Sequence, residues 1–313
     1  MKNKIVSTLV LGTALSLTAN AAVMDKGVQT LTFDYSRTSA NSIWKGDNKI
    51  NYFCANTGSG ADCGNGIGQT TYTTYSLGHG IGLGWGLQLD TRVTYTVSVM
   101  DYGSHPAQAV GPVDAPQKDI SEVSLRLTKN LISKEKHGTD VYLQYKHPGG
   151  NDEPQNPTFL AVNDYSSHLT LGVTETLNLV KNWTWIFDAS YTKRSTADKL
   201  KAFDLPADQL NFRLDLPYQF SDRISAGAGL TYLHTTGGPD IGGSDWGAGN
   251  VLFSAAGHPP FYAVRERFVG YSMFGSYYIP KADAWVGLSR FRKLSGRNTD
   301  ISRTWAVFLG MYL

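Results

Sequence analysis

The sequence predicts an all-β protein, a transmembrane antiparallel up-and-down β-barrel of about 12 strands. Apolar and polar residues alternate with a period of two through most of the chain, as in strands that present one face to lipid and the other to water. The connections between these strands alternate between short and long, and the chain ends on an uncharged apolar strand. No segment beyond the amino-terminal region offers about 18 apolar residues in a row, which argues against membrane-spanning helices.

The amino-terminal residues 1–21 have the pattern of a cleaved signal peptide. Lys2 and Lys4 precede an apolar run over residues 5–17, and Ala19-Asn20-Ala21 supplies the small residues after which a signal peptidase cuts. That run is too short to span a membrane as a helix. We therefore expect the chain to be exported and this segment to be removed.

The mature chain, residues 22–313, is expected to form a single barrel domain, because no Pro-rich or Ser-rich linker divides it. Its formal net charge of +2 falls to zero without Lys2 and Lys4, so no basic surface for nucleic acid is implied. The chain contains 17 Tyr, 7 Trp, 13 Phe and 33 Gly but is only 41% hydrophobic, which is too polar for a bundle of membrane helices.

The alternation that marks strands is clearest over residues 87–99, where apolar side chains alternate with Gln88, Asp90 and Arg92. The same pattern recurs along the chain. The predicted strands cover residues 28–37, 69–77, 84–101, 119–130, 139–146, 164–177, 183–194, 207–216, 224–234, 263–279, 284–293 and 303–313.

The predicted connections fall into two classes, as the short periplasmic turns and long external loops of membrane barrels do. Short connections are expected near residues 78–83, 131–138, 178–182, 217–223 and 280–283. Long ones are expected near residues 38–68, 102–118, 147–163, 195–206, 235–262 and 294–302. An even strand number leaves both termini in the periplasm.

The carboxyl-terminal strand has no charged residue between Trp305 and Leu313. It resembles the assembly signal of outer-membrane proteins, which usually ends in Phe, whereas Leu313 stands at that place here. The resemblance implies insertion into the outer membrane of a Gram-negative bacterium. Outer-membrane lipid and the barrel-assembly machinery would then be its partners.

The two cysteines, Cys54 and Cys63, lie in a Gly, Asn and Asp-rich stretch that is expected to be an external loop. An oxidising compartment favours a disulfide between them, which would stabilise the loop by about 2 to 3 kcal/mol. A metal site is the alternative, but it lacks further Cys and a nearby His. No metal and no cofactor are therefore expected.

Charged side chains at the polar positions of the alternating pattern are expected to face the lumen. An Arg or Lys on the lipid face near the midplane of the bilayer would cost about 2 to 4 kcal/mol. The candidate lumen residues are Asp34, Asp90, Arg92, Arg126, Lys146, His168, Asp188, Arg213 and Asp215, with the uncharged Tyr142, Gln144 and Asn211 beside them. They could pair with one another to satisfy their charges, or they could line a solute path. Both roles stay open at this stage.

A barrel of this width is expected to hold a narrow, partly occluded passage, since about 8 strands leave a filled interior and about 16 to 18 an open channel. We expect no enzyme and no catalytic residue. Ser167 and His168 are adjacent in a strand and so face opposite sides, which leaves only some other lumen Ser as a partner for His168.

Several short motifs resemble the outer-membrane family named for the meta-pathway of phenol degradation. They are Phe33-Asp34-Tyr35-Ser36-Arg37 followed by Lys45-Gly46, then Tyr75-Ser76-Leu77-Gly78, and Ser295-Gly296-Arg297-Asn298-Thr299. Members are described as transporters, so the resemblance implies uptake of small aromatic or other hydrophobic compounds.

The leading functional hypothesis is a passive outer-membrane channel for small-molecule solutes. A narrow nucleoside-type channel fits the same strand number. From another class, the alternative is a non-transporting barrel with a salt-bridged lumen, whose long loops bind surface partners.

Overall fold

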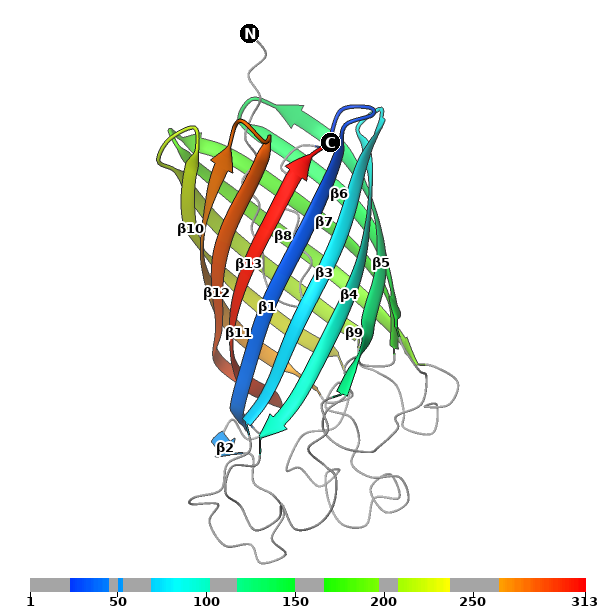
Figure 1. The fold of residues 1–313 in the computed structure, drawn as a ribbon, viewed down its shortest axis with the longest axis vertical. Helices are drawn as coiled ribbons and strands as arrows, with labels where there is room; N and C mark the ends of the chain where they lie inside the picture. Colours follow the sequence, from blue (N-terminus) through cyan, green and yellow to red (C-terminus); the bar gives the residue numbers. More distant parts are fainter. Residues whose placement is uncertain are drawn as a thin grey trace, which may run out of the picture.

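The computed structural model describes residues 23–44, 50–52, 69–101, 117–149, 166–196, 208–236 and 265–313, which form one antiparallel sheet closed into a barrel (Figure 1). The predicted signal peptide, residues 1–21, lies outside the described residues, and so do Cys54 and Cys63. Among the described residues, no helix is long and apolar enough to cross a bilayer.

The strands are long and follow one another around the barrel in sequence order. Their bounds are β1 Gln29–Trp44, β2 Ile50–Tyr52, β3 Gln69–Gly84, β4 Leu87–Asp101, β5 Gln117–Lys134, β6 His137–Pro148, β7 Ser166–Val180, β8 Trp183–Thr196, β9 Asp208–Gln219, β10 Ile224–Thr236, β11 Arg267–Ile279, β12 Ala284–Arg297 and β13 Thr299–Tyr312. The short β2 pairs only with the end of β1, so twelve strands form the wall, which confirms the predicted fold class.

The barrel closes where β1 pairs with β13, in a register that runs from Thr30 opposite Tyr312 to Thr38 opposite Thr304. The backbone N–H of Leu313 donates to the carbonyl of Gln29 and extends this seam to the last residue. Every wall strand therefore has a partner on both sides, which satisfies the backbone polar groups that a bilayer cannot hydrogen-bond.

Short turns join the strands at the end of the barrel where the carboxyl terminus lies, at the top of Figure 1. One of the two-residue turns is Trp85-Gly86 between β3 and β4, where both residues have positive φ angles, 53° and 70°. Two positive φ values in a two-residue hairpin loop are typical of a type I′ turn, whose twist matches that of the flanking strands.

Two predicted connections are wrong. The long connection expected at residues 294–302 does not exist, because Asn298 alone joins β12 to β13. It adopts a φ of 51°, and its side-chain amide donates to the carbonyl of Arg265 over 2.8 Å. The turn expected at residues 78–83 is part of β3, whose inward glycines leave room for side chains from the neighbouring strands.

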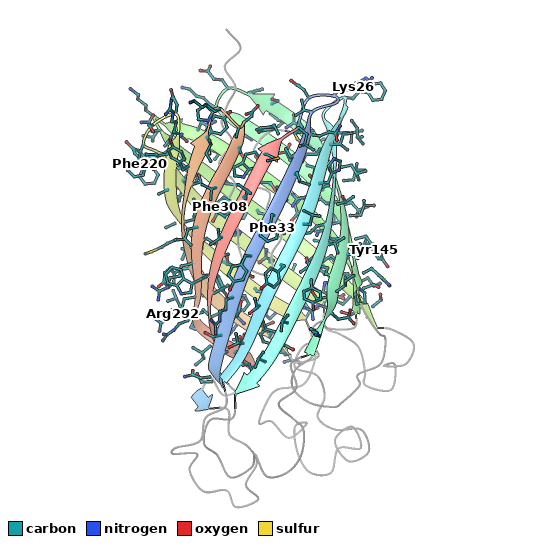
Figure 2. The ribbon with its side chains drawn as sticks, in the orientation of Figure 1. Lys26, Phe33, Tyr145, Phe220, Arg292 and Phe308 are labelled. Atoms are coloured by element: carbon teal, nitrogen blue, oxygen red, sulfur yellow. The ribbon has the colours of Figure 1, made fainter. Side chains whose placement is uncertain are left out.

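The two faces of the wall differ in polarity, as the alternation predicts. Large apolar side chains such as Phe33, Leu171 and Trp305 are exposed on the outside, while the buried interior holds mainly Ser, Thr and charged residues. Figure 2 shows the outer side chains along the whole wall, including Phe33 and Tyr145. An apolar exterior around a polar interior is the arrangement of a barrel surrounded by lipid.

Candidate solute path inside the barrel

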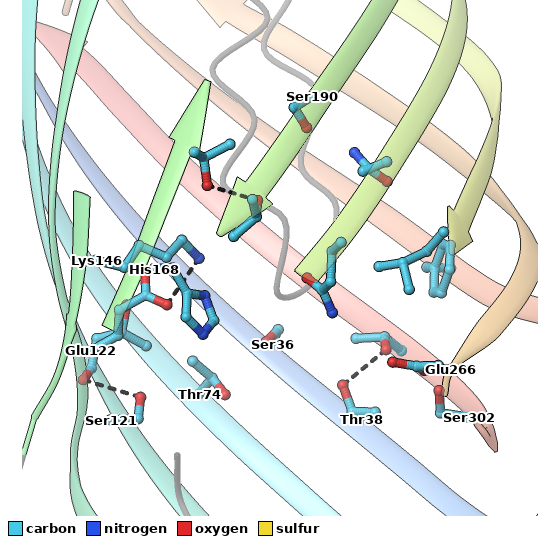
Figure 3. A pocket seen from close by; sticks show the side chains of 18 of the residues that line it. Ser36, Thr38, Thr74, Ser121, Glu122, Lys146, His168, Ser190, Glu266 and Ser302 are labelled. Carbon is cyan, nitrogen blue, oxygen red and sulfur yellow. Dashed lines mark hydrogen bonds and ion pairs between the residues drawn. The ribbon is translucent and has the colours of Figure 1, made fainter. Parts of the chain in front are cut away.

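A cavity of about 500 Å³ lies inside the barrel and is lined by side chains from all twelve wall strands. It extends from Glu266 and Lys293, near the strand ends that the long connections join, to Tyr142 and Asp188 in the middle of β6 and β8. Figure 3 shows part of its lining, with Glu266, Lys146 and His168 labelled. The space is therefore the lumen of the outer half of the barrel.

Hydroxyl groups make up much of the cavity wall and bond to one another across neighbouring strands. The Oγ1 atoms of Thr170 and Thr192 lie 2.8 Å apart, and those of Thr38 and Thr304 lie 2.8 Å apart. Because each hydroxyl can donate or accept, such a wall can exchange its own hydrogen bonds for bonds to a solute.

One side of the cavity is apolar. Leu233, Phe268 and Phe291 line it, and the two phenyl rings meet edge to face with their centroids 6.2 Å apart. The Phe291 ring lies over Gly270 of β11, where an added Cβ would come within 2.4 Å of it. We call these three residues the aromatic patch.

Three polar groups lie at the outer rim of the cavity. Lys293 forms ion pairs with Asp300 and, at 3.1 Å, with Glu266, while Lys146 Nζ donates to Glu122 Oε2 over 2.9 Å. The third group is the pair Ser166 and His168 on β7.

His168 and Ser166 share the inward face of β7, and His168 Nε2 lies 2.8 Å from Ser166 Oγ. This is the other lumen serine that the sequence leaves open as a partner. Ser166 is buried, and the contact lies in a wall that contains similar hydroxyl hydrogen bonds.

Below the cavity, charged side chains cross the lumen wall. Arg92 of β4 reaches over Gly78 of β3 to form an ion pair with Asp34 of β1. Gly78 leaves the room for this bridge, because strand glycines mark places where other groups approach closely.

A second bridge joins β6 to β8. The Tyr142 hydroxyl donates to Asp188 Oδ1 over 3.2 Å, and its ring lies across Gly172, where an added Cβ would come within 2.3 Å. The guanidinium of Arg126 stacks 3.7 Å from the centre of the Tyr142 ring. Thr174 also donates to Asp188, over 2.8 Å.

A third pair is Arg213 and Asp215 on β9, with Nε and Oδ2 separated by 2.6 Å. These three groups form a band of both charge signs at mid-height, which we call the charged band: Asp34, Arg92, Arg126, Tyr142, Asp188, Arg213 and Asp215.

A much smaller cavity lies beyond the charged band. Its volume is about 50 Å³, it lies beside Asp90, Arg92 and Arg126, and Gln88 Nε2 donates to Asp90 there over 2.8 Å. Phe274, packed on Ile186, and the completely buried Phe308 also lie in this half of the interior. We call the large cavity on the other side of the charged band the vestibule.

The structure places all nine candidate lumen residues on the inward face, but in separate groups. Lys146, His168 and Asp188 line the vestibule, whereas Asp34, Asp90, Arg92, Arg126, Arg213 and Asp215 lie at or below its floor. Their part in a solute path is a proposal, argued below.

Sequence reasoning missed the aromatic patch and the rim residues Lys293 and Asp300. Asp300 was missed because residues 294–302 were interpreted as a loop, whereas β13 already begins at Thr299. Lys293 shares its parity with Ser289 and Phe291 on β12, and this alternation is the signal that could have identified it as inward-facing.

No protein-family model matches the chain, and no curated protein matches it. Among solved structures, an outer-membrane channel from Pseudomonas putida F1 is similar with a TM-score of 0.66 and 11% identity, covering 94% of this chain and 98% of that one. At this identity the similarity concerns the fold alone.

Two further structures are more distant. The translocator domain of the autotransporter NalP from Neisseria meningitidis has a TM-score of 0.48 and 10% identity over 92% of this chain and 89% of that one. The CymD monoaromatic hydrocarbon channel has a TM-score of 0.46 and 8% identity over 93% and 89%. These scores are too low to bear on this chain, and the fold is therefore assigned from its own closed sheet and its similarity to the Pseudomonas barrel: a twelve-stranded barrel of the outer-membrane type.

Proposed function

We propose that this protein is a passive channel of the Gram-negative outer membrane that admits small molecules through its lumen. The observation that carries this proposal is the vestibule of about 500 Å³, lined by side chains from all twelve wall strands. Pockets of about 300 to 1,000 Å³ accommodate drug-sized molecules. A barrel that served only as a scaffold would have no need for such a space.

The chemistry of the vestibule suits small amphipathic solutes, and phenolic compounds in particular. A ring could pack on Phe268 and Phe291 while its hydroxyl bonds to the Thr and Ser wall. The motif resemblance to the phenol-degradation family supports the same class of solute. A nucleoside, with a base to stack and a sugar to hydrogen-bond, is the close alternative.

We assign the charged band the role of a filter. Its ion pairs hold the lumen narrow, and an ionic solute would have to lose water and compete with pairs that already exist. Small neutral solutes are therefore expected to pass in preference to ions.

The test is solute flux into liposomes that carry the refolded mature protein, comparing phenol, a nucleoside and a sugar with protein-free vesicles. Faster entry of phenol than of the sugar supports the proposal. Faster entry of the nucleoside than of phenol would favour the nucleoside alternative. No flux of any solute, with folding verified by β-type circular dichroism, would contradict both.

A second candidate function is a non-transporting barrel that acts through its loops. The observation that favours it is the burial of Arg213 and Asp215, each with only 2% of its side chain exposed. In that case replacing Arg92 and Arg213 by Ala would lower stability and leave permeation absent, whereas in a channel the same changes alter flux.

Export through cleavage after residue 21 is part of the proposal, because a barrel must reach the outer membrane to conduct. Amino-terminal sequencing of the protein from isolated outer membranes is expected to begin at Ala22.

A further inference from the structure

Four arginines gather on the outer, lipid-facing side of β1, β12 and β13. Arg292 and Arg303 are directly opposite each other in the register of β12 and β13. Trp305 of β13 lies between two arginines: it is opposite Arg290 on β12 and opposite Arg37 on β1. Arg303 is thus the direct neighbour of one arginine and the diagonal neighbour of the other two, and we call the four residues the arginine cluster.

The cluster begins where the apolar band of the barrel ends, on three adjacent strands. Toward the end with the short turns, the same faces carry Phe33 on β1, Leu288 on β12 and Val307 on β13, all exposed. Trp305 lies at the boundary, where aromatic residues of membrane barrels form a girdle. Figure 2 shows Arg292 on the outside of the wall, beyond Phe33 toward the strand ends that the long connections join. This level corresponds to the headgroups of the outer leaflet.

Nothing on the described part of the wall neutralises these charges. Among the described residues, no carboxylate lies within ion-pair distance of the cluster. The Nε atoms of Arg290 and Arg292 are buried without a hydrogen-bond partner, and the Arg290 guanidinium lies 4.8 Å from the centre of the Trp305 ring. Like charges directly opposite each other in a sheet repel. Within the described part of the chain the cluster therefore has no counter-charge, which leaves its surroundings to supply one.

We propose that the arginine cluster is a binding site for the phosphate of an outer-leaflet glycolipid, the phosphorylated diglucosamine of lipid A. The occupant of a lipid-facing surface is lipid, and the headgroup level is where that lipid carries phosphate. Guanidinium groups bind phosphate through two parallel hydrogen bonds, and all four cations here are Arg rather than Lys. The exposed lysines of the far wall, Lys118 on β5 and Lys193 on β8, stand apart and form no such group.

The test compares wild type with an Arg292→Gln/Arg303→Gln variant, each refolded as the full mature chain in detergent. Native mass spectrometry measures binding of bis-phosphorylated lipid A, of the same lipid without phosphates, and of inorganic phosphate. A Lys118→Gln/Lys193→Gln variant removes the same number of outward cations elsewhere and serves as the matched control.

Wild type is expected to bind the bis-phosphorylated lipid at least about tenfold more tightly than the phosphate-free lipid, as charge-assisted hydrogen bonds predict. The arginine variant should lose this preference and the lysine control should keep it. Equal binding by wild type and the arginine variant, or an equal loss in the lysine control, would overturn the proposal. The proposal would also be overturned if inorganic phosphate bound as tightly as the lipid. It would be overturned as well if the wild type formed a dimer without lipid and the arginine variant did not. If the double variant does not refold, Arg303→Gln alone and the charge-conserving Arg303→Lys provide the same comparison.

Discussion

Arg213 Nε lies 2.6 Å from Asp215 Oδ2 on the inward face of β9, and only 2% of either side chain is exposed. Asp215 lies across Gly229 of β10, where an added Cβ would come within 2.1 Å of its Oδ1 atom. The Nη2 atom of Arg213 and the Oδ1 atom of Asp215 have no hydrogen-bond partner, so the pair depends on its mutual contact. Removing either partner leaves a buried charge without compensation.

Asp215→Ala and Arg213→Ala are each expected to lower the free energy of unfolding by about 3 to 5 kcal/mol. The double variant should cost less than the sum, because no unpaired charge remains. Urea unfolding of the barrel in lipid vesicles measures both effects. Additive costs would show that the pair does not interact.

Gly287→Ala is expected to destabilise the barrel, because an added Cβ would lie 1.9 Å from the ring of the completely buried Phe308. The cost of such overpacking is about 1 to 3 kcal/mol. Gly275→Ala is the matched control in neighbouring β11, since the nearest atom to its added Cβ is 3.6 Å away. Equal unfolding curves for the two variants would contradict this account of the interior.

Asn298→Ala is expected to cost more stability than Asn298→Gly. Both variants lose the side-chain contacts of Asn298, including the amide hydrogen bond to Arg265, but glycine tolerates the φ of 51° at this position, whereas alanine also meets a backbone penalty of about 1 kcal/mol. Thermal unfolding of both variants tests this order. The reverse order would mean that Asn298 is not held in the left-handed region.

Phe291→Leu is expected to reduce phenol entry relative to sugar entry. Leucine keeps the position apolar, but the phenol ring can no longer stack on an aromatic ring there. The flux ratio in liposomes should fall several-fold while the unfolding midpoint changes little. A uniform change for both solutes would instead indicate that Phe291 only sets the width of the vestibule.

Cys54 and Cys63 are predicted to form a disulfide, and neither should react with maleimide before reduction. Both should react after reduction, which mass spectrometry counts directly. Labelling of the unreduced, unfolded protein would contradict the prediction.

The period-two alternation was enough to identify the wall strands, and the structure confirms their number because each side of a strand meets either lipid or lumen. It failed at Gly78 and Asn298. A short connection was expected at residues 78–83, but Gly78, Gly80 and Gly82 allow close packing inside β3. At the other position, Asn298 in the left-handed region takes the place of an expected long loop. Neither role is visible without the neighbouring strand.

The alternation of side chains along each strand also predicted which charged side chains face inward, but it did not predict which of them contact one another. Arg92 reaches Asp34 across β3, and Tyr142 reaches Asp188 across β7, because a glycine on the intervening strand leaves the space. Such contacts depend on the register of three strands at once. The arginine cluster was missed for two reasons. Arg37 comes beside Arg303 only where β1 pairs with β13 to close the barrel, and the loop expected at residues 294–302 concealed the pairing of Arg292 with Arg303 on β12 and β13.

The claim that solutes pass through the lumen is tested most directly by blocking it from inside. Ser190 lines the vestibule, and its neighbour Ala189 faces the opposite side of β8. In a background where both native cysteines are Ser, phenol flux should fall sharply when Ser190→Cys is modified with a bulky charged thiol reagent, and should not change for Ala189→Cys treated in the same way. Undiminished flux through fully modified Ser190→Cys protein would contradict a path through the lumen.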